Sequence, residues 1–420
     1  MSHRQVNDPT ASVGAPVWLS VIGIGDDGLA SIGPRARAVI EVADVVFGGV
    51  RHLEMIPDHP GERRPWRQPL EHSLDDIEAL RPEGLGGKKV VVLASGDPMC
   101  FGVGALIAKR FAGDEIQMLP VASAFSLACA RLGWALQDVE TLSLHNRPPS
   151  TLRRYLQPGA RLVALTRDGD TPHLVASLLV EMGFGPSHIH VFEHLGGTNE
   201  RRVDATAERW AAKDITALNT VAIECIAGPS ARVFAGAPGL PDDAFASDGM
   251  LTRREIRALT LARLMPFPGQ CLWDVGAGSG AVAIEWLRSA RRGRAIAIER
   301  DKARALRAAS NAEALGTPEL DVVEAEAPTC FDRLAAPDAI FIGGGITAPD
   351  MLSQAWRRLA PGGRLVANVV TLEGERKLMD WQAEHGGDLV RLAISRAEKV
   401  GPYQGWRPAM PITQYAGVKS

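Results

Sequence analysis

The order of apolar and polar positions along the chain predicts strands that alternate with helices. The first apolar run, residues 17–25, has the length and composition of a strand, and helical spacing follows through 33–43 before another short strand at 44–49. The same pattern of a strand running into a loop returns at 88–98, 161–170, 188–197 and 219–228. Strands that alternate with helices favour a mainly parallel sheet with both faces covered. The pattern therefore predicts an α/β fold.

A second α/β series begins after residues 235–249, where proline, glycine and aspartate crowd together without apolar periodicity. We interpret this stretch as a linker between domains. The next segment, 252–264, is a predicted helix that opens with a capping box. In that motif Thr252 bonds a backbone amide of the first turn, and Glu255 reaches back to the start of the helix. Further strand and helix patterns follow towards the end of the chain.

The length of 420 residues is too great for one ordinary core, so we expect more than one domain. With the linker placed as above, the expected division is a flexible leader at 1–15, a first α/β domain at 16–238 and a second at 239–420. The hydrophobic fraction is 46% and the charged fraction 23%, which are values of globular proteins and argue against a largely disordered chain.

The glycine-rich stretch "LWDVGAGSGAVAIEW", residues 272–286, predicts a loop that grips a nucleotide-like ligand. Gly276, Gly278 and Gly280 stand where a strand turns into a helix, and glycine allows a tight turn and a close approach of the backbone to a ligand. The spacing also satisfies the looser dinucleotide fingerprint, with Ala281 in its last position. Glu299, at the end of the following strand, would hold ribose hydroxyls of either kind of cofactor.

Three details favour S-adenosylmethionine (SAM) over a dinucleotide. Asp274 precedes the first glycine, where a carboxylate suits a positively charged methionine group and would repel a pyrophosphate. The glycines alternate with Ala277 and Ser279, which makes a wider loop than a pyrophosphate needs. The next strand ends in the polar residues 324–328, which suit the edge of an adenine. An NAD(P)-dependent oxidoreductase and a glycine-rich turn without any ligand remain alternatives at this point.

The charge and the cysteine content limit the kinds of ligand and partner that the protein is expected to bind. The formal net charge is −3, so nothing in it indicates nucleic-acid binding. Arginine dominates the basic residues and makes forked contacts to carboxylates, which keeps an acidic small molecule open as substrate. The five cysteines are widely spaced without a CxxC pair, so we expect neither disulfides nor a bound metal. No secretory signal or membrane-spanning run stands out, and we expect a cytoplasmic protein without membrane contact.

Motifs in a fixed order connect the first half with a known family. The stretches are "VIGIGDDG", "ADVVFGGVRHL", "ASGDP", "LHNRP" and "FEHLGGTNERR". Together they resemble the tetrapyrrole methylases of cobalamin biosynthesis. The second half, with "LTRREIRAL", the glycine loop, "AIAIER", "PDAIFIGGG" and "GGRLVANVVTLE", is similar to the companion decarboxylating methylase. Fused in this order over about 17–415, the chain resembles the two-domain C5,15-methylases of that pathway.

The resemblance implies a tetrapyrrole-methylase-type α/β domain followed by a Rossmann-like class I SAM methyltransferase domain. It implies two SAM sites per chain and an acidic tetrapyrrole, precorrin-6Y, as the shared substrate. The first half would methylate C5, and the second would methylate C15 and drive loss of the C12 acetate carboxyl. Family precedent implies a homo-oligomer. A fused methyltransferase for another macrocycle and a SAM-binding protein without turnover remain alternatives.

Site residues are carried over position by position. In the second half the SAM contacts implied are Thr252, Asp274, Gly276, Ala277, Gly278, Ser279, Gly280, Glu299, Glu326 and Ala327, with Gly343 to Gly345 facing the reaction cleft. In the first half they are Gly23, Gly25, Asp97, Ser123 and Thr166. One departure is the loop Pro120-Val121-Ala122-Ser123-Ala124, where the family usually has Pro-Gly-x-Ser-Ser.

The substrate implied carries many carboxylates, which gives the arginines a role. Bidentate pairing of guanidinium and carboxylate groups is plausible for those in the motifs, although each could equally belong to a solvated charged face. The candidates are Arg51, Arg147, Arg201 and Arg202 in expected loops of the first half, and Arg253, Arg254 and Arg257 on the helix at 252–264. Methyl transfer from a sulfonium needs no protein nucleophile, so positioning carries much of the expected rate, and no catalytic residue is assigned.

Overall fold

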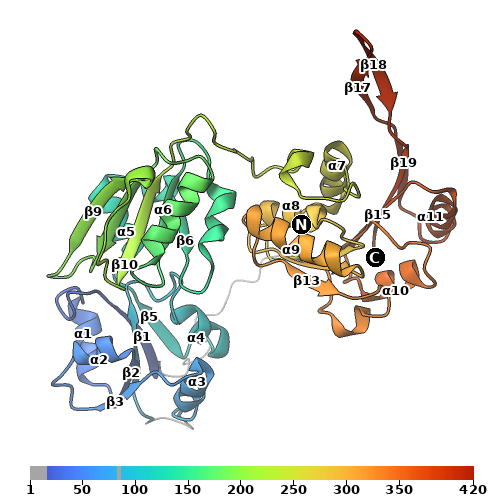
Figure 1. Ribbon diagram of the computed structural model, residues 1–420. Coiled ribbons are helices and arrows are strands. Elements are labelled where there is room, and N and C mark those ends of the chain that lie inside the picture. The colour runs from blue at the N-terminus through green and yellow to red at the C-terminus, as the bar shows by residue number, and fades with distance from the viewer. Residues whose placement is uncertain (1–16, 83–86) are drawn as a thin grey trace, which may run out of the picture. The chain divides into compact units, whose positions relative to one another are not determined.

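The computed structural model describes residues 17–82 and 87–420 (Figure 1). The expected leader at 1–15 lies outside these residues. The chain divides by its internal contacts into two compact units. The first comprises the described residues up to Arg147 together with 159–228, and the second comprises 148–158 and 229–420. The division therefore comes earlier than residues 238 and 239, where the linker placed it.

The first unit begins with a parallel sheet of order β3-β2-β4-β1-β5. Its strands are β1 (Leu19–Ile24), β2 (Val45–Gly48), β3 (Glu62–Pro65), β4 (Val90–Ser95) and β5 (Ile116–Leu119). The helices around it are α1 (Pro34–Glu41), α2 (Val50–Glu54), α3 (Leu70–Glu78) and α4 (Gly104–Arg110). Successive side chains of a strand point to opposite faces. Accordingly Leu19 and Val21 join one hydrophobic core, and Ile22 and Ile24 join the other.

The second sheet of this unit contradicts the expectation of a mainly parallel arrangement. Its order is β6-β7-β10-β8-β9, and only β6 and β7 run parallel. The strands are β6 (Glu140–Ser143), β7 (Arg161–Leu165), β8 (His188–Glu193), β9 (Arg201–Thr206) and β10 (Asn219–Glu224). The helices α5 (Ala124–Leu132) and α6 (Thr171–Glu181) accompany them. The last strand, β10, inserts antiparallel between β7 and β8, and an apolar run does not reveal strand direction.

The second unit is built on a seven-stranded sheet of order β13-β12-β11-β14-β15-β19-β16. The strands are β11 (Cys271–Val275), β12 (Arg294–Glu299), β13 (Asp321–Glu324), β14 (Ala339–Ile342), β15 (Arg364–Val369), β16 (Asp388–Leu392) and β19 (Ile412–Val418). The first five are parallel, and β19 lies antiparallel between β15 and β16. The order reverses between β11 and β14, and ligands of open α/β sheets bind at such a switch point.

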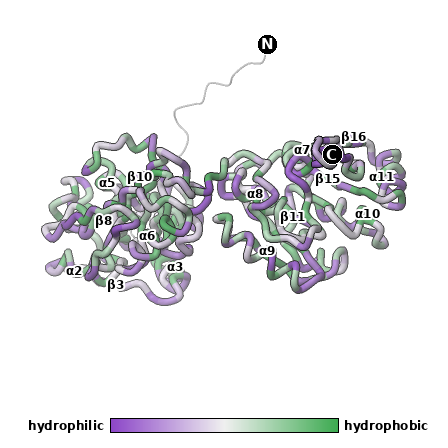
Figure 2. Tube along the Cα trace, turned by 45° about the horizontal axis from the view of Figure 1, so that its top comes forward, coloured by the Kyte–Doolittle hydropathy of each residue, from purple (hydrophilic) through white to green (hydrophobic). Residues whose placement is uncertain are grey.

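Five helices accompany this sheet, and an exposed hairpin extends from it (Figure 1). The helices are α7 (Arg254–Leu264), α8 (Ala281–Ser289), α9 (Lys302–Ala314), α10 (Met351–Arg358) and α11 (Leu372–His385), and the hairpin consists of β17 (Ser395–Val400) and β18 (Tyr403–Pro408). Trp273 and Trp286 are fully buried on the two sides of the sheet, as core residues of the two clusters. Hydrophobic and hydrophilic residues alternate along the trace of both units (Figure 2). In the described part of the chain, no helix is long and apolar enough to cross a membrane.

The interpretation of 235–249 as a linker is wrong. Leu240 and Phe245 from this stretch are buried in the core of the second unit, against residues of α8. The backbone amides of Gly239 and Leu240 donate to the carboxylate of Glu285 on α8, at 2.6 and 2.9 Å. The stretch has no regular secondary structure long enough to create apolar periodicity, so its two buried side chains were not visible as a pattern.

A short segment of the first half packs within the second unit. The 3₁₀ helix η2 (Pro149–Tyr155) belongs to this segment, and Arg154 forms a 2.7 Å ion pair with Glu319. Arg154 is only 12% exposed and also donates to the carbonyl of Leu287. No sequence pattern indicates this excursion, because it depends on packing between residues far apart in the chain.

Candidate functional site

A large cleft lies in the second unit, at the carboxyl ends of β11, β12, β14 and β15. It has a volume of about 870 Å³, towards the upper end of the ~300–1,000 Å³ typical of small-molecule pockets. Most residues predicted for the second cofactor site line it. These are Thr252, Asp274, Gly276, Ala277, Gly278, Ser279, Glu299, Glu326, Ala327 and Gly343, together with Gly344 and Gly345.

The backbone of the glycine loop has the conformation that the sequence predicted. Gly276, Gly278 and Gly280 all have positive φ angles, of 72°, 57° and 74°, which L-residues with a side chain rarely adopt. A Cβ atom on Gly276 would stand 2.9 Å from the backbone of Gly344, so the loops after β11 and β14 meet without any side chain between them. This close approach forms the floor of the cleft.

Gly280 lies apart from the other two glycines of the loop. It does not line the cleft, and a Cβ atom there would stand 3.0 Å from that of Ala308 on α9. Gly280 is the N-cap of α8, so it serves the turn and the packing of two helices. Packing thus accounts for glycine at this position, and the contact of Gly280 with a cofactor stays a prediction.

Glu299 organises the loop at the end of β12. One carboxylate oxygen accepts a hydrogen bond of 2.9 Å from the amide of Gly278, and the other accepts one of 3.0 Å from the amide of Asp301. A carboxylate has about four lone-pair sites, so Glu299 retains acceptor capacity for hydroxyl groups of a ligand. The position at the end of the second strand of the motif is the one that the sequence predicted.

Asp274 lies fully buried under the loop, with 1% exposure. Burial raises its pKa to about 7, with a smaller upward contribution from the nearby Glu299, and the hydrogen bond from the amide of Ala283 opposes the shift. A buried carboxylate without a cation favours its neutral form. Asp274 is thus a group whose charge a positively charged ligand would stabilise.

The capping box predicted for α7 is not formed. The helix begins at Arg254, its N-cap is Arg253, and no side chain caps it. Thr252 lies before the cap, and its carbonyl accepts a hydrogen bond of 2.6 Å from Arg257. Glu255 instead pairs with Arg396 from β17. The motif was misread because the chain stays extended for one residue more than its sequence suggested.

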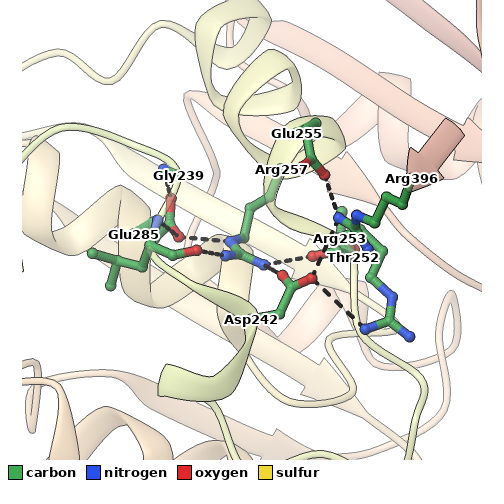
Figure 3. A network of polar contacts seen from close by, with 9 residues as sticks. Gly239, Asp242, Thr252, Arg253, Glu255, Arg257, Glu285 and Arg396 are labelled. Carbon is green, nitrogen blue, oxygen red and sulfur yellow. Dashed lines mark hydrogen bonds and ion pairs between the residues drawn. The ribbon is translucent and has the colours of Figure 1, made fainter. Parts of the chain in front are cut away.

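Arg257 is not available to a substrate, contrary to the prediction. Its side chain is fully buried, and it donates to Glu285 at 2.6 Å (Figure 3). It also donates to the carbonyl of Leu240. A further ion pair of 3.3 Å joins it to Asp242. Arg257 holds together α7, α8 and the segment that precedes them. Arg254 is exposed and does not line the cleft, so of the three arginines only Arg253 does.

Sequence reasoning missed the far wall of this cleft. Leu392, Ile394, Ala409 and Ile412 line it from the chain leading into and out of the hairpin, and Arg396 lies at its rim. Asn368 on β15 also lines the cleft, and its amide is held by Thr260 at 2.9 Å and by Gln414 at 2.9 Å. Asn368 falls within the quoted stretch "GGRLVANVVTLE" but was not singled out. No motif indicated Leu392 and Ile412, which the antiparallel strands β16 and β19 bring to the cleft.

The first unit has a much smaller cleft, of about 120 Å³, at the carboxyl ends of its strands. Gly25, Asp97, Ser123 and Arg51 line it, as predicted. Gly23 and Thr166 do not. A Cβ on Gly23 would stand 1.9 Å from the carbonyl oxygen of Gly96, so that glycine serves a close contact between loops. Thr166 is buried and donates to Asn219.

A cluster around Asp26 stands at the mouth of this smaller cleft. Asp26 forms an ion pair with Arg51, and one of its carboxylate oxygens lies 3.0 Å from Nδ1 of His194. The ring of His52 lies 3.0 Å from the hydroxyl of Ser95, and burial lowers its pKa to about 4, with help from the neighbouring Arg51. Asp26 and His194 were within quoted motifs but were not singled out, since only the fold brings them together.

The other arginines of the first half that were predicted to bind the substrate do not line either cleft. Arg147 is exposed. Arg201 and Arg202 open β9 rather than lying in a loop, and they pair with Glu193 and Asp204. These ion pairs explain both residues without a substrate. In the described residues no group of three or more metal-ligating side chains comes together.

Comparison with known families accounts for both units. Residues 19–211 match the family described as tetrapyrrole (corrin/porphyrin) methylases, and residues 243–419 match the family described as the precorrin methyltransferase domain. A precorrin-6Y C(5,15)-methyltransferase (decarboxylating) from Sinorhizobium sp. is 48% identical over 403 residues, which cover 96% of this chain and 96% of that protein.

Relatives named for a single methylation match less than half of the chain. A cobalt-precorrin-7 C(5)-methyltransferase from Salmonella typhimurium is 33% identical over 44% of this chain and 88% of its own length. A probable cobalt-precorrin-6B C(15)-methyltransferase (decarboxylating) from Pyrobaculum aerophilum is 34% identical over 43% of this chain and 96% of its own length. The two-part organisation of the chain thus has counterparts among separate proteins.

Proposed function

We propose that this chain, which belongs to the family of precorrin-6Y C(5,15)-methyltransferases (decarboxylating), methylates precorrin-6Y at C5 and C15 and removes the C12 acetate carboxyl as CO2. The product is precorrin-8, in cobalamin biosynthesis. The single observation that carries the proposal is the large cleft at the switch point of the second sheet. The glycine loop, Asp274 and Glu299 all line this cleft.

The residues of this cleft fit SAM. Gly276 lets the loops after β11 and β14 lie in contact, Gly278 keeps the loop free of a side chain, and Glu299 offers acceptors for the ribose hydroxyls. When bound, SAM supplies a methyl group on a positively charged sulfur. Asp274 becomes an anion in a site that has lost its water, which strengthens its attraction for a cation. Asp274 thus favours a sulfonium cofactor, whose charge stabilises its anion, over a dinucleotide, whose pyrophosphate would keep it protonated.

The division of labour between the units is also proposed. The second unit would methylate C15 and release CO2, because the apolar wall of Leu392, Ile394 and Ile412 would strip water from a carboxylate placed against it. The first unit would methylate C5. Its cleft of about 120 Å³ is smaller than a typical ligand pocket, so binding there requires the cleft to widen.

The proposal places the protein in the cytoplasm as a homo-oligomer. In the described part of the chain the cysteines form no disulfide, which suits a reducing compartment. On the hairpin, Val400, Tyr403 and Trp406 are 63%, 76% and 77% exposed. A two-stranded ribbon is marginally stable alone in water, and large exposed apolar groups mark association surfaces. A second copy of the chain would cover them.

Equilibrium dialysis of the full chain against labelled SAM tests the proposal. We expect two sites in the wild type and one in Gly278→Arg, because Gly278 lines the large cleft and its amide is engaged by Glu299. Incubation with precorrin-6Y should yield a product with two added methyl groups and one CO2 lost. Absence of SAM binding would refute the proposal, and binding of NAD in its place would favour an oxidoreductase.

SAM binding to the large cleft should depend on pH through Asp274. Its pKa of about 7 in the free protein means that the carboxyl holds a proton below that pH. A cation binds better to the ionised form, so binding releases a proton. Affinity should rise by up to about tenfold per pH unit as the pH approaches 7 and level off above it. Calorimetric titration between pH 5.5 and 8.5, values chosen to be about 1.5 units on each side of a pKa of about 7, would measure this.

Matched variants isolate the cause of that dependence. Asp274→Asn should flatten the pH dependence and weaken binding at high pH. Asp338→Asn is the control, because Asp338 accepts a hydrogen bond from the amide of Cys271, at the opposite end of β11. An unchanged pH dependence in Asp274→Asn would show that another group titrates.

A further inference from the structure

The large cleft has two ends of different chemistry. The glycine loop, Asp274 and Glu299 form one end, and the apolar wall from the chain around the hairpin forms the other. A volume of about 870 Å³ leaves room for part of a second molecule beside a cofactor. The second, apolar end of the cleft therefore helps to determine which substrate binds.

Two arginines from distant parts of the chain meet at the rim of this second end. Arg253 is the N-cap of α7, and Arg396 lies on β17. Both guanidinium groups lie 3.7 Å from the same carboxylate oxygen of Asp242, and Figure 3 shows them converging on it. Both residues line the cleft, with side chains that are 52% and 45% exposed.

These arginines have donors to spare. A guanidinium group carries five N–H donors. The distance between Arg253 and Asp242 exceeds that of a hydrogen bond, and Arg396 uses one nitrogen, Nη2, to donate to Glu255 at 2.5 Å. Asp242 is also shared with the buried Arg257. Asp242 therefore interacts with three guanidinium groups at once. It holds the two at the rim in place and leaves some of their N–H donors available to a ligand.

We infer that Arg253 and Arg396 together bind one carboxylate of a polycarboxylate macrocycle and set its ring against the apolar wall. The inference rests on the proposed function and adds a specificity-determining residue, Arg396, that no motif indicated. The carboxylate held is one that the product retains. A carboxylate stabilised by two guanidinium groups resists loss of CO2, whereas the one that leaves needs the apolar wall.

The test uses Arg396→Gln, Arg253→Gln and the double variant of the full chain. The control is Arg407→Gln, because Arg407 faces Arg396 in the register of the hairpin but pairs with Glu398 and does not line the cleft. Release of CO2 from precorrin-6Y reports on the second unit. Binding of uroporphyrin, a macrocycle with carboxylate side chains, and of its uncharged methyl ester is followed by fluorescence.

Each single variant should raise the KM for CO2 release by about tenfold or more, as expected for a lost hydrogen bond between charged groups. The value of kcat and the SAM affinity should change little. Arg396→Lys should restore only part of the affinity, because lysine keeps the charge but not the forked geometry. The control should behave as the wild type, and the ester should bind equally to all variants.

Two results would overturn the inference: a KM in both single variants equal to that of the control, or equal loss of acid and ester binding. Failure of the proposed function looks different. In that case the wild type releases no CO2. Weaker uroporphyrin binding by Arg253→Gln and Arg396→Gln still supports a carboxylate site, whereas unchanged binding overturns the inference.

Discussion

Arg257→Ala should lower the free energy of unfolding by about 3–5 kcal/mol, the cost of breaking a buried ion pair by removing one partner. The substitution would leave the Glu285 carboxylate, 2% exposed, without its cation and would leave the carbonyls of Leu240 and Thr252 without a donor. Urea unfolding of the full chain measures the loss, and hydrogen exchange in α7 and α8 localises it.

Arg263→Ala provides the matched control. Arg263 lies on the same helix and forms an ion pair of 2.6 Å with Asp388, but its side chain is 40% exposed. Exposed pairs contribute about 0–1 kcal/mol, so this variant should unfold nearly as the wild type does. Equal effects of both substitutions would contradict the structural role of Arg257 and reopen its assignment to the substrate.

Gly276→Val should abolish SAM binding in the large cleft, with a fall in affinity of more than about 100-fold, or some 2.7 kcal/mol. A side chain at this position combines a φ of 72° with a Cβ only 2.9 Å from the backbone of Gly344. The loops after β11 and β14 would have to separate, which displaces the glycine loop. Equilibrium dialysis and the rate of CO2 release would record the loss.

The control for this substitution is Gly362→Val. Gly362 has nearly the same φ, 73°, but a Cβ there would meet nothing within 4 Å. It should therefore incur backbone strain of about 1–2 kcal/mol without losing SAM. If Gly276→Val bound SAM as Gly362→Val does, the contact between the two loops would not shape the site.

The sequence predicted the glycine loop and its acids because their requirements are local. A positive φ calls for glycine at Gly276 and Gly278, and the end of the next strand fixes Glu299. The same locality explains why most residues predicted for the second cofactor site line one cleft. The sequence did not reveal that Gly280 packs against α9, since whether a glycine faces a ligand or a neighbouring helix depends on what packs against it.

The roles of charged side chains were harder to predict. Arg253, Arg254 and Arg257 follow one another on one segment, yet the first lines the cleft, the second is exposed outside it and the third is buried. Helical rotation separates them, and Glu285, on another helix, decides that Arg257 can be buried at all. An unpaired arginine could not occupy that position, because burying a charge without a partner is costly.

By itself the sequence determined the α/β class, the two-part organisation, the family and the glycine-rich turn at 272–286. The class and the organisation follow from periodicity, and the turn follows from residues whose backbone or charge is needed where they stand. The family follows from the resemblance of the ordered motifs. Only the tertiary structure decided the direction of β10, the packing of 148–158 in the second unit, and the meeting of Arg396 with Arg253 at one rim. Each of these depends on contacts between segments far apart in the chain, and such contacts leave no period or motif in the sequence.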